Sequence, residues 1–163
     1  MRLVREGRVE DDAFVHVGDD VELVPPGDVI VSLARWERER AQLVSRSGRL
    51  GVRIDGTVSL DRLSPDLPCF AVVAIEFRPF ADGRGYSVAR LLRERHGYRG
   101  ELRAIGNVLR DQLLYLRRCG FDAFEIDPKK KPEDALAALQ EMSVFYQAAA
   151  DLPLPLWKRV ARA

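Results

Sequence analysis

The sequence predicts an α/β fold built on a mostly parallel sheet of about five strands that alternate with helices. Three observations predict it: apolar runs of five to eight residues, charged amphipathic stretches of about ten residues between them, and short connections. Such an alternation is typical of parallel strands joined by right-handed crossovers. Two arrangements fit, an open doubly wound sheet and a sheet curved like part of a β/α barrel. A complete eight-fold barrel needs roughly 200 residues or more, and the chain has 163.

The N-terminal part has the weakest pattern. Residues 1–27 are expected to form an irregular segment of a single domain that spans residues 1–163. Phe14–Val17 and Val21–Val24 are candidates for short strands within it. The first strong strand prediction is Val29–Leu33, directly after a proline- and glycine-rich break.

The middle of the chain alternates more regularly. A charged helix is expected over Trp36–Ser45, ending before Gly48, because glycine commonly terminates helices. A strand is expected at Leu50–Ile54, and residues 60–67 are expected to form a loop or a short helix. The apolar run Phe70–Phe77 suits a strand that is buried on both faces.

The second half gives the clearest helical and strand patterns. Ser87 is the expected N-cap of the first of its helices, and residues 133–149 have the strongest helical period of the chain. The apolar, proline-broken tail at residues 151–163 either packs back on the domain or docks a partner. The remaining predictions are helices at Val88–His96, Val108–Arg118 and Glu133–Ala149, and strands at Glu101–Ile105 and Phe121–Ile126.

Composition gives little direct indication of function. The chain is 47% hydrophobic and 31% charged with a net charge of +1, as in an ordinary globular protein that binds neither nucleic acid nor an anionic membrane. No window approaches the roughly 18 apolar residues of a membrane span. Residues 76–118, however, contain ten arginines and only five acidic residues. This excess favours a small anionic ligand or an acidic partner. The alternative is that the arginines simply lie on solvent-exposed helix faces.

The cysteines and histidines do not form a cofactor or metal motif. Cys69 and Cys119 are the only cysteines, and without a signal peptide pattern they indicate free thiols in a reducing cytoplasm. Two cysteines cannot supply the four thiolates of an iron–sulfur cluster. His16 and His96 lack the spacing of metal ligands. We therefore expect no cofactor and no metal, and no residue is assigned a catalytic role. Cys119 is expected to be a small buried core residue.

One loop has the composition of a ligand-binding site. Residues 82–87 lie between the apolar run Phe70–Phe77 and a helix, and in an open α/β sheet ligands bind at the carboxyl ends of the strands. The loop lacks the third glycine of a dinucleotide-binding loop, where Val88 stands, and also lacks the P-loop lysine. NAD, FAD or ATP bound in the usual way is therefore not expected. A purely structural alternative is a tight turn that its aspartate caps. The loop consists of Asp82, Gly83, Arg84, Gly85, Tyr86 and Ser87.

Further polar residues are expected near this loop. Asn107, Arg110 and Asp111 follow the next strand and should meet the loop at the same sheet edge, and Arg103 completes the set of predicted ligand-binding residues. Arginines beside helix N-termini suit a phosphate, sulfate, sulfite or carboxylate. Glu101 and Arg103 share one strand face, where they form either a polar cavity wall or an ion pair.

Five segments resemble a family of bacterial proteins of unknown function, the DUF934 family. They are Phe80–Ser87, Ala89–Arg93, Gly100–Ala104, Gly106–Gln112 and Cys119–Asp122. Members of this family are described as probable oxidoreductases or accessory proteins of assimilatory sulfite reduction, because of their association with sulfur-assimilation enzymes. The resemblance implies an accessory protein or small subunit that binds a sulfite reductase hemoprotein. The alternative is an enzyme or sensor that binds a small anion or phosphorylated metabolite at residues 82–87.

Overall fold

A single curled sheet forms the centre of the computed structural model, which describes residues 2–78 and 82–160. The sheet has eight strands in the order β2-β1-β8-β7-β6-β5-β4-β3. Neighbouring strands from β3 to β8 are parallel, whereas β1 is antiparallel to both β8 and β2. The strands are β1 (Arg2–Arg5), β2 (Arg8–Asp11), β3 (Val15–His16), β4 (Val29–Ser32), β5 (Leu50–Asp55), β6 (Val72–Phe77), β7 (Glu101–Gly106) and β8 (Ala123–Ile126).

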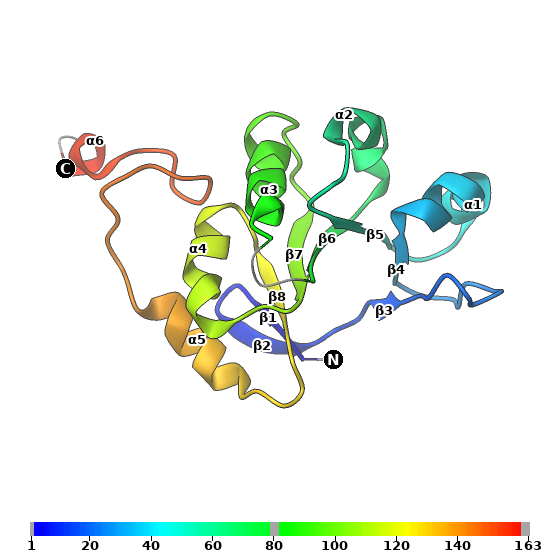
Figure 1. Cartoon of the computed structure of the whole chain (residues 1–163), viewed down its shortest axis with the longest axis horizontal. Coiled ribbons are helices and arrows are strands. Elements are labelled where there is room, and N and C mark those ends of the chain that lie inside the picture. The colour runs from blue at the N-terminus through cyan, green and yellow to red at the C-terminus, as the bar shows by residue number, and fades with distance from the viewer. Residues whose placement is uncertain (1, 79–81, 161–163) are drawn as a thin grey trace.

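All of the described helices except the last pack against the convex face of this half-barrel (Figure 1). Their buried side chains form one core cluster with the strand residues that point the same way. None of the described helices is long and apolar enough to cross a membrane. The helices are α1 (Leu33–Ser45), α2 (Leu60–Leu63), α3 (Arg84–Glu94), α4 (Leu113–Arg118), α5 (Pro132–Gln140) and α6 (Leu156–Val160), with 3₁₀ turns at Ser64–Cys69 and Arg110–Gln112.

The concave face has a different cover. The segment between β2 and β3 crosses it, and Phe14 from this segment packs against Ile30, Val72, Ala74 and Ile105. None of the described helices contributes to this second apolar cluster. The doubly wound arrangement, with helices on both faces, is therefore excluded, and the curved, barrel-like alternative is the one that forms.

The strong strand predictions are confirmed within one or two residues, but the strand count was too low. The N-terminal segment was expected to be irregular, yet it contributes β1 and β2 at one edge of the sheet. Its candidate strand at Phe14–Val17 is confirmed, as β3 at the other edge. The candidate strand at Val21–Val24 does not form. β1 and β2 escape a search for apolar patterns because five of their eight side chains are charged: Arg2, Arg5, Arg8, Glu10 and Asp11.

Several helix boundaries also differ from the prediction. α3 begins at Arg84 rather than after Ser87, because the Asp82 carboxylate accepts the backbone N–H of Arg84 at 3.1 Å. Ser87 is therefore not the N-cap. α4 begins at Leu113 rather than Val108, since the chain first makes the 3₁₀ turn, at which the Gln112 side chain accepts the N–H of Leu109 at 3.1 Å.

The predicted helix over residues 133–149 ends at Gln140. Beyond it, arginine side chains bind backbone carbonyls of the segment that was predicted to be helical. Arg159 donates to the carbonyl of Phe145 and Arg118 donates to that of Gln147, both at 2.7 Å. Tertiary contacts thus override the local helical preference of this segment.

Candidate functional site

The carboxyl edge of the parallel strands brings together the loops in which the sequence placed a site. The backbone N–H of Asn107, after β7, donates to the carbonyl of Phe77 at the end of β6 at 2.7 Å. The Lys130 ammonium, after β8, donates to the carbonyl of Val108 at 3.1 Å. The three loops therefore meet at one edge, as expected. Residues 79–81, which include part of the family motif, lie outside the described residues.

Within the predicted loop, Asp82 and Arg84 bind each other. The Arg84 Nε and Nη2 atoms each donate to a carboxylate oxygen of Asp82 at 2.8 Å. This bidentate pair and the capping bond from the Arg84 backbone lower the pKa of Asp82 to about 2. Asp82 thus fixes the start of α3 and neutralises the guanidinium that the sequence assigned to an anion.

The rest of the loop contributes to packing. A side chain at Gly85 would begin 2.7 Å from the ring of Phe77, so α3 approaches β6 closely only because this position lacks one. Tyr86 packs between Phe77 and Tyr115, with ring centroids 5.3 Å apart in each pair. Gly83 and Ser87 are exposed. The loop composition is therefore largely explained by how α3 sits on the sheet.

The other arginines of this edge also have carboxylate partners. Arg78 pairs with Glu76 at 3.0 Å, and Arg110 pairs with Glu141, which follows α5. Asn107 and Asp111 are exposed, near Arg110. An anion at this edge must therefore compete with an existing carboxylate for each of the three guanidinium groups described there.

Arg103 does not lie at this edge. Its side chain is fully buried on the concave face of the sheet, in the middle of β7. The guanidinium donates to Glu101 at 2.7 Å, to Asp12 at 2.6 Å and to Glu125 at 3.2 Å. The ion-pair interpretation of Glu101 and Arg103 is therefore the one that the structure shows, and two further carboxylates join the pair.

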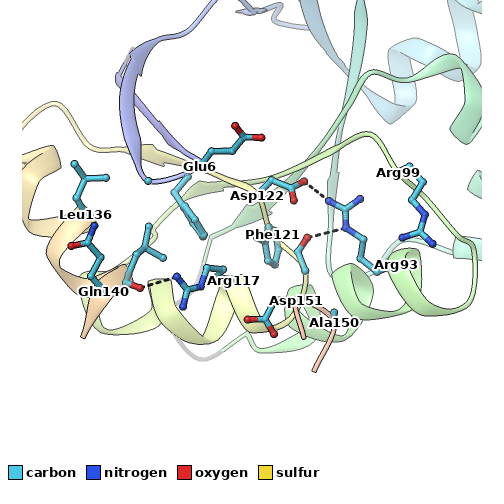
Figure 2. Close-up of a pocket in the computed structure, with 14 residues that line it drawn as sticks. Glu6, Arg93, Arg99, Arg117, Phe121, Asp122, Leu136, Gln140, Ala150 and Asp151 are labelled. Carbon is cyan, nitrogen blue, oxygen red and sulfur yellow. Dashed lines mark hydrogen bonds and ion pairs between the residues drawn. The ribbon is translucent and has the colours of Figure 1, made fainter. Parts of the chain in front are cut away.

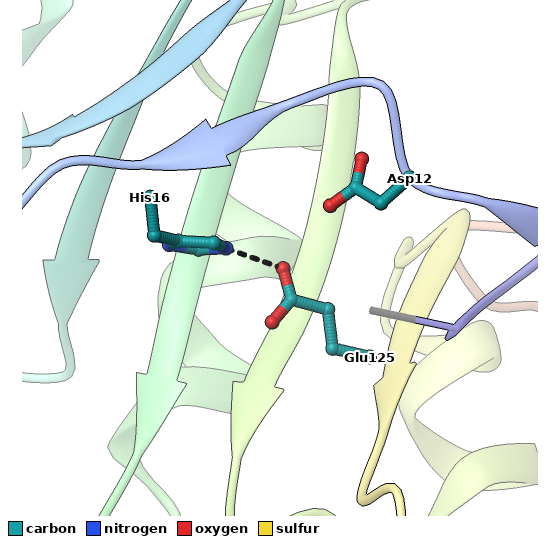
Figure 3. Close-up of side chains that lie close together, drawn as sticks. All are labelled: Asp12, His16 and Glu125. Atoms are coloured by element: carbon teal, nitrogen blue, oxygen red, sulfur yellow. Dashed lines mark hydrogen bonds and ion pairs between the residues drawn. The ribbon is translucent and has the colours of Figure 1, made fainter.

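These contacts belong to a larger group that we call the concave-face ion cluster. Arg5 links Glu101, at 3.1 Å, to Glu10, and His16 Nε2 lies 2.6 Å from Glu125 Oε1 (Figure 3). The cluster contains four carboxylates and two guanidinium groups. It fastens the N-terminal segment to β7 and β8. Its members are Arg5, Glu10, Asp12, His16, Glu101, Arg103 and Glu125.

The electrostatics of the cluster depend on Arg103. Burial alone would lower the pKa of Arg103, but the Glu101 and Asp12 carboxylates outweigh burial, and the pKa is raised. The guanidinium is therefore a permanent positive charge that compensates carboxylates held in a poorly solvated place. Its Nη2 atom is buried and has no hydrogen-bond acceptor among the described residues.

Three members of the cluster have the chemistry of metal ligands. Asp12, His16 and Glu125 each offer an atom, and these atoms lie within 4.8 Å of one another. A divalent cation there would have to displace the Arg103 guanidinium, which already donates to both carboxylates. We therefore interpret the group as an ion-pair network that holds the N-terminal segment. Sequence reasoning missed Asp12, His16 and Glu125 because they lie far apart in the chain.

The two cysteines are both free. Cys119 is buried, as expected, and burial raises the pKa of its thiol. The neighbouring arginines at the end of α4 thus do not activate it. Cys69 is exposed and lies in the 3₁₀ turn before β6. The buried Cys119 therefore lacks the partly exposed surroundings of a reactive cysteine.

The C-terminal arm, residues 141–160, is the part of the described chain with the most exposed apolar side chains. It leaves α5, passes α4 and ends in α6 at the periphery of the molecule (Figure 1). Exposure of five of its large apolar side chains ranges from 52% to 69%. These side chains are Met142, Val144, Tyr146, Trp157 and Val160.

Arg118 at the end of α4 fastens this arm to the body. Its guanidinium lies 4.1 Å from the ring centroid of Phe145, donates to the carbonyl of Gln147 and pairs with Asp151 at 3.3 Å. Its own backbone carbonyl accepts the N–H of Ala150 at 3.1 Å. The arm is thus held at its middle, while its large apolar side chains stay exposed.

Comparison with protein families identifies the chain. The family model described as "Bacterial protein of unknown function (DUF934)" matches residues 51–157. Comparisons with curated proteins and with solved structures find no match. The match begins at β5 and ends inside α6. It includes Glu101, Arg103 and Glu125 but not their N-terminal partners. The chain belongs to the DUF934 family of bacterial proteins of unknown function.

Proposed function

We propose that this protein is an accessory protein or small subunit of assimilatory sulfite reduction that binds a sulfite reductase hemoprotein. Two lines of argument support a binding role rather than electron transfer. The family is associated with sulfur-assimilation enzymes, which is an argument from association and not from chemistry. In addition, one buried and one exposed cysteine cannot supply the four thiolates of an iron–sulfur cluster.

The observation that carries the proposal is the exposed apolar surface of the C-terminal arm. Tryptophan and tyrosine are enriched among the residues that dominate binding energy at protein interfaces. Trp157 and Tyr146 are 58% and 69% exposed. Because Arg118 holds the backbone of the arm, these rings are presented from an anchored segment. Anchoring reduces the conformational entropy that the arm loses when a partner binds.

Co-purification from native cells tests the proposal. The tagged wild-type chain is expected to retain the sulfite reductase hemoprotein, identified by mass spectrometry and by haem absorbance. The double variant Tyr146→Glu/Trp157→Glu is expected to lose it, because two carboxylates would have to be desolvated in the interface.

The matched control is Leu23→Glu. Leu23 is also an exposed apolar residue, at 83%, but it lies in the segment before β4, outside the arm. This variant should retain the hemoprotein as the wild type does. Absence of the hemoprotein from the wild-type eluate, or equal retention by the double variant, would contradict the proposed function.

A further inference from the structure

The hairpin of β1 and β2 ends the sheet in a strand that is paired on one side alone. β2 pairs with β1, and it is the outermost strand of the sheet on its other side. Three of its four side chains are exposed, those of Arg8, Val9 and Asp11. An edge strand of this kind presents N–H and C=O groups that can pair with a strand of another chain.

The turn of the hairpin determines which backbone groups of β2 point outward. Arg5 and Arg8 face each other across the hairpin. The two residues between them, Glu6 and Gly7, have φ angles of 50° and 74°, as both central residues of a type I′ turn require. The pair that closes such a turn is hydrogen-bonded and the next pair along the ladder is not. The N–H and C=O groups of Val9 therefore point away from β1, toward the open edge.

The end of the hairpin borders open space. Figure 2 shows Glu6 of the turn at the rim of a hollow of about 660 Å³, which Leu136 and Gln140 of α5 also line. Together with the exposed side chains of β2, this hollow leaves the end of the hairpin accessible to another chain.

The charges on β2 show which kind of strand fits this edge. Arg8 and Glu10 are two residues apart and therefore lie on the same face of the sheet. Glu10 pairs with Arg5. Arg8 forms no ion pair within residues 2–78 and 82–160, and the residue directly opposite it on β1 is Arg5. Like charges directly opposite destabilise a strand pair. A carboxylate on the other side of Arg8, at the open edge, would offset this repulsion.

A second copy of β2 supplies that carboxylate. Two β2 strands can pair antiparallel about a two-fold axis that passes through the Val9 pair, perpendicular to the sheet. Arg8 of each copy then lies opposite Glu10 of the other copy, which gives two pairs of opposite charge. Moving the axis by one residue in either direction places Arg8 opposite Arg8, or Glu10 opposite Glu10. Charge complementarity therefore selects the register that is centred on Val9.

We propose that the protein forms a homodimer by antiparallel pairing of two β2 strands in this register. Charged side chains usually keep an edge strand from pairing, but the alternation of Arg8 and Glu10 makes two copies of β2 complementary. β2 has four residues, so the association is weak and reversible, with a Kd in the micromolar range or above. The proposal does not depend on hemoprotein binding, because it uses residues outside the C-terminal arm.

Sedimentation velocity of the full chain tests the proposal at concentrations from about 1 to 500 µM. We expect a monomer–dimer equilibrium that weakens as the salt concentration is raised to about 1 M, because salt screens the exposed ion pairs. Arg8→Glu is expected to weaken dimerisation at least about tenfold, since both attractive pairs become repulsive. The monomer should stay folded, because the introduced carboxylate faces Arg5 across the hairpin.

A mixture of two variants tests the register. Glu10→Arg alone is expected to dimerise as poorly as Arg8→Glu, because two guanidinium groups then face each other in each pair. When the two variants are mixed, both cross-strand pairs have opposite charges again. Sedimentation with a fluorescent label on one variant should therefore show a heterodimer of about wild-type affinity.

Two further variants keep the test independent of Glu10, which belongs to the concave-face ion cluster. Val9→Pro removes an N–H that points to the open edge, where proline is tolerated in a strand, and should abolish dimerisation. The matched control Arg2→Glu makes the same change of charge as Arg8→Glu on β1, away from the open edge, and should dimerise like the wild type. Circular dichroism checks that each variant is folded.

The proposal is overturned if the wild type stays monomeric at every concentration, or if Arg8→Glu or Val9→Pro dimerises like the wild type. It is also overturned if the two folded charge variants form no heterodimer when mixed. Tyr146→Glu/Trp157→Glu should dimerise like the wild type, and loss of the dimer in this variant would place the contact in the C-terminal arm instead. None of these results depends on whether the chain retains the hemoprotein.

Discussion

Arg103 is the residue on which the concave face of the sheet depends. Three carboxylates, those of Asp12, Glu101 and Glu125, lie within hydrogen-bonding distance of its guanidinium, and Arg103 itself is not exposed at all. Replacing a buried ion network by apolar groups is often neutral, but removing one partner leaves uncompensated charge. The attachment of the N-terminal segment to the sheet therefore depends on the Arg103 side chain.

We expect Arg103→Met to lower the free energy of unfolding by about 3–5 kcal/mol, because it leaves the carboxylates buried without a counter-ion. Urea unfolding followed by circular dichroism measures the change. The control Arg90→Met removes an exposed arginine that pairs with Glu94 on the surface of α3, and its cost should stay below about 1 kcal/mol. Equal costs for the two variants would mean that the buried cluster does not hold the fold.

The Asp82–Arg84 pair gives a pH-dependent prediction at the same scale. The pKa of Asp82 is lowered from 3.8 to about 2, chiefly by the Arg84 side chain. A lowered carboxyl pKa stabilises the folded state above the ordinary pKa, and this stabilisation is lost as the pH falls through about 2. Carboxyl ¹³C NMR should show Asp82 titrating near pH 2 in the wild type and near its ordinary value in Arg84→Met. A wild-type titration near the ordinary value would show that the two groups do not pair in solution.

At the scale of elements, the C-terminal arm is held to the body largely through Arg118. Arg118 supplies the cation–π contact with Phe145, the hydrogen bond to Gln147 and the ion pair with Asp151. A segment held in this way opens more readily than the strands, whose backbone groups are paired in the sheet.

We therefore expect Arg118→Met to release the arm while the sheet stays folded. Hydrogen exchange and limited proteolysis within residues 141–160 should accelerate at least several-fold, with exchange in β5–β8 unchanged. Arg95→Met, an exposed arginine near the end of α3, serves as the control and should behave like the wild type. Unchanged protection of the arm in Arg118→Met would show that other contacts hold it.

The elements also show what a sequence can reveal. β5, β6, β7 and β8 were predicted nearly to their ends because burial on both faces produces apolar runs. β1 and β2 were missed because most of their side chains are charged; of these, Arg5 finds a partner, Glu101, on β7. The start of α4 and the end of α5 were misplaced because side chains such as Gln112, Arg118 and Arg159 bind backbone groups that the local pattern assigned to the helix.

The candidate site was predictable only in part, for the same reason. The composition of residues 82–87 indicates a loop at a sheet edge, and the loops do meet there. The partner of each arginine, however, is set by the fold: Arg110 finds Glu141, and Arg103 finds Asp12, 91 residues away. Whether a guanidinium is free for a ligand therefore cannot be read from its neighbours in the sequence.

At the scale of the whole molecule, the three surfaces have different chemistry. The carboxyl edge of the sheet is compensated internally, the concave face is closed by the ion cluster, and the C-terminal arm exposes apolar side chains. The exposed apolar side chains of the C-terminal arm support the proposal that the protein binds another macromolecule.

Sedimentation velocity of the purified chain mixed with the purified sulfite reductase hemoprotein tests this proposal. We expect a faster-sedimenting complex that carries haem absorbance at micromolar concentrations. The complex should also form with Leu23→Glu and be lost with Tyr146→Glu/Trp157→Glu. If the wild-type chain and the hemoprotein sediment separately at these concentrations, the proposed binding is wrong.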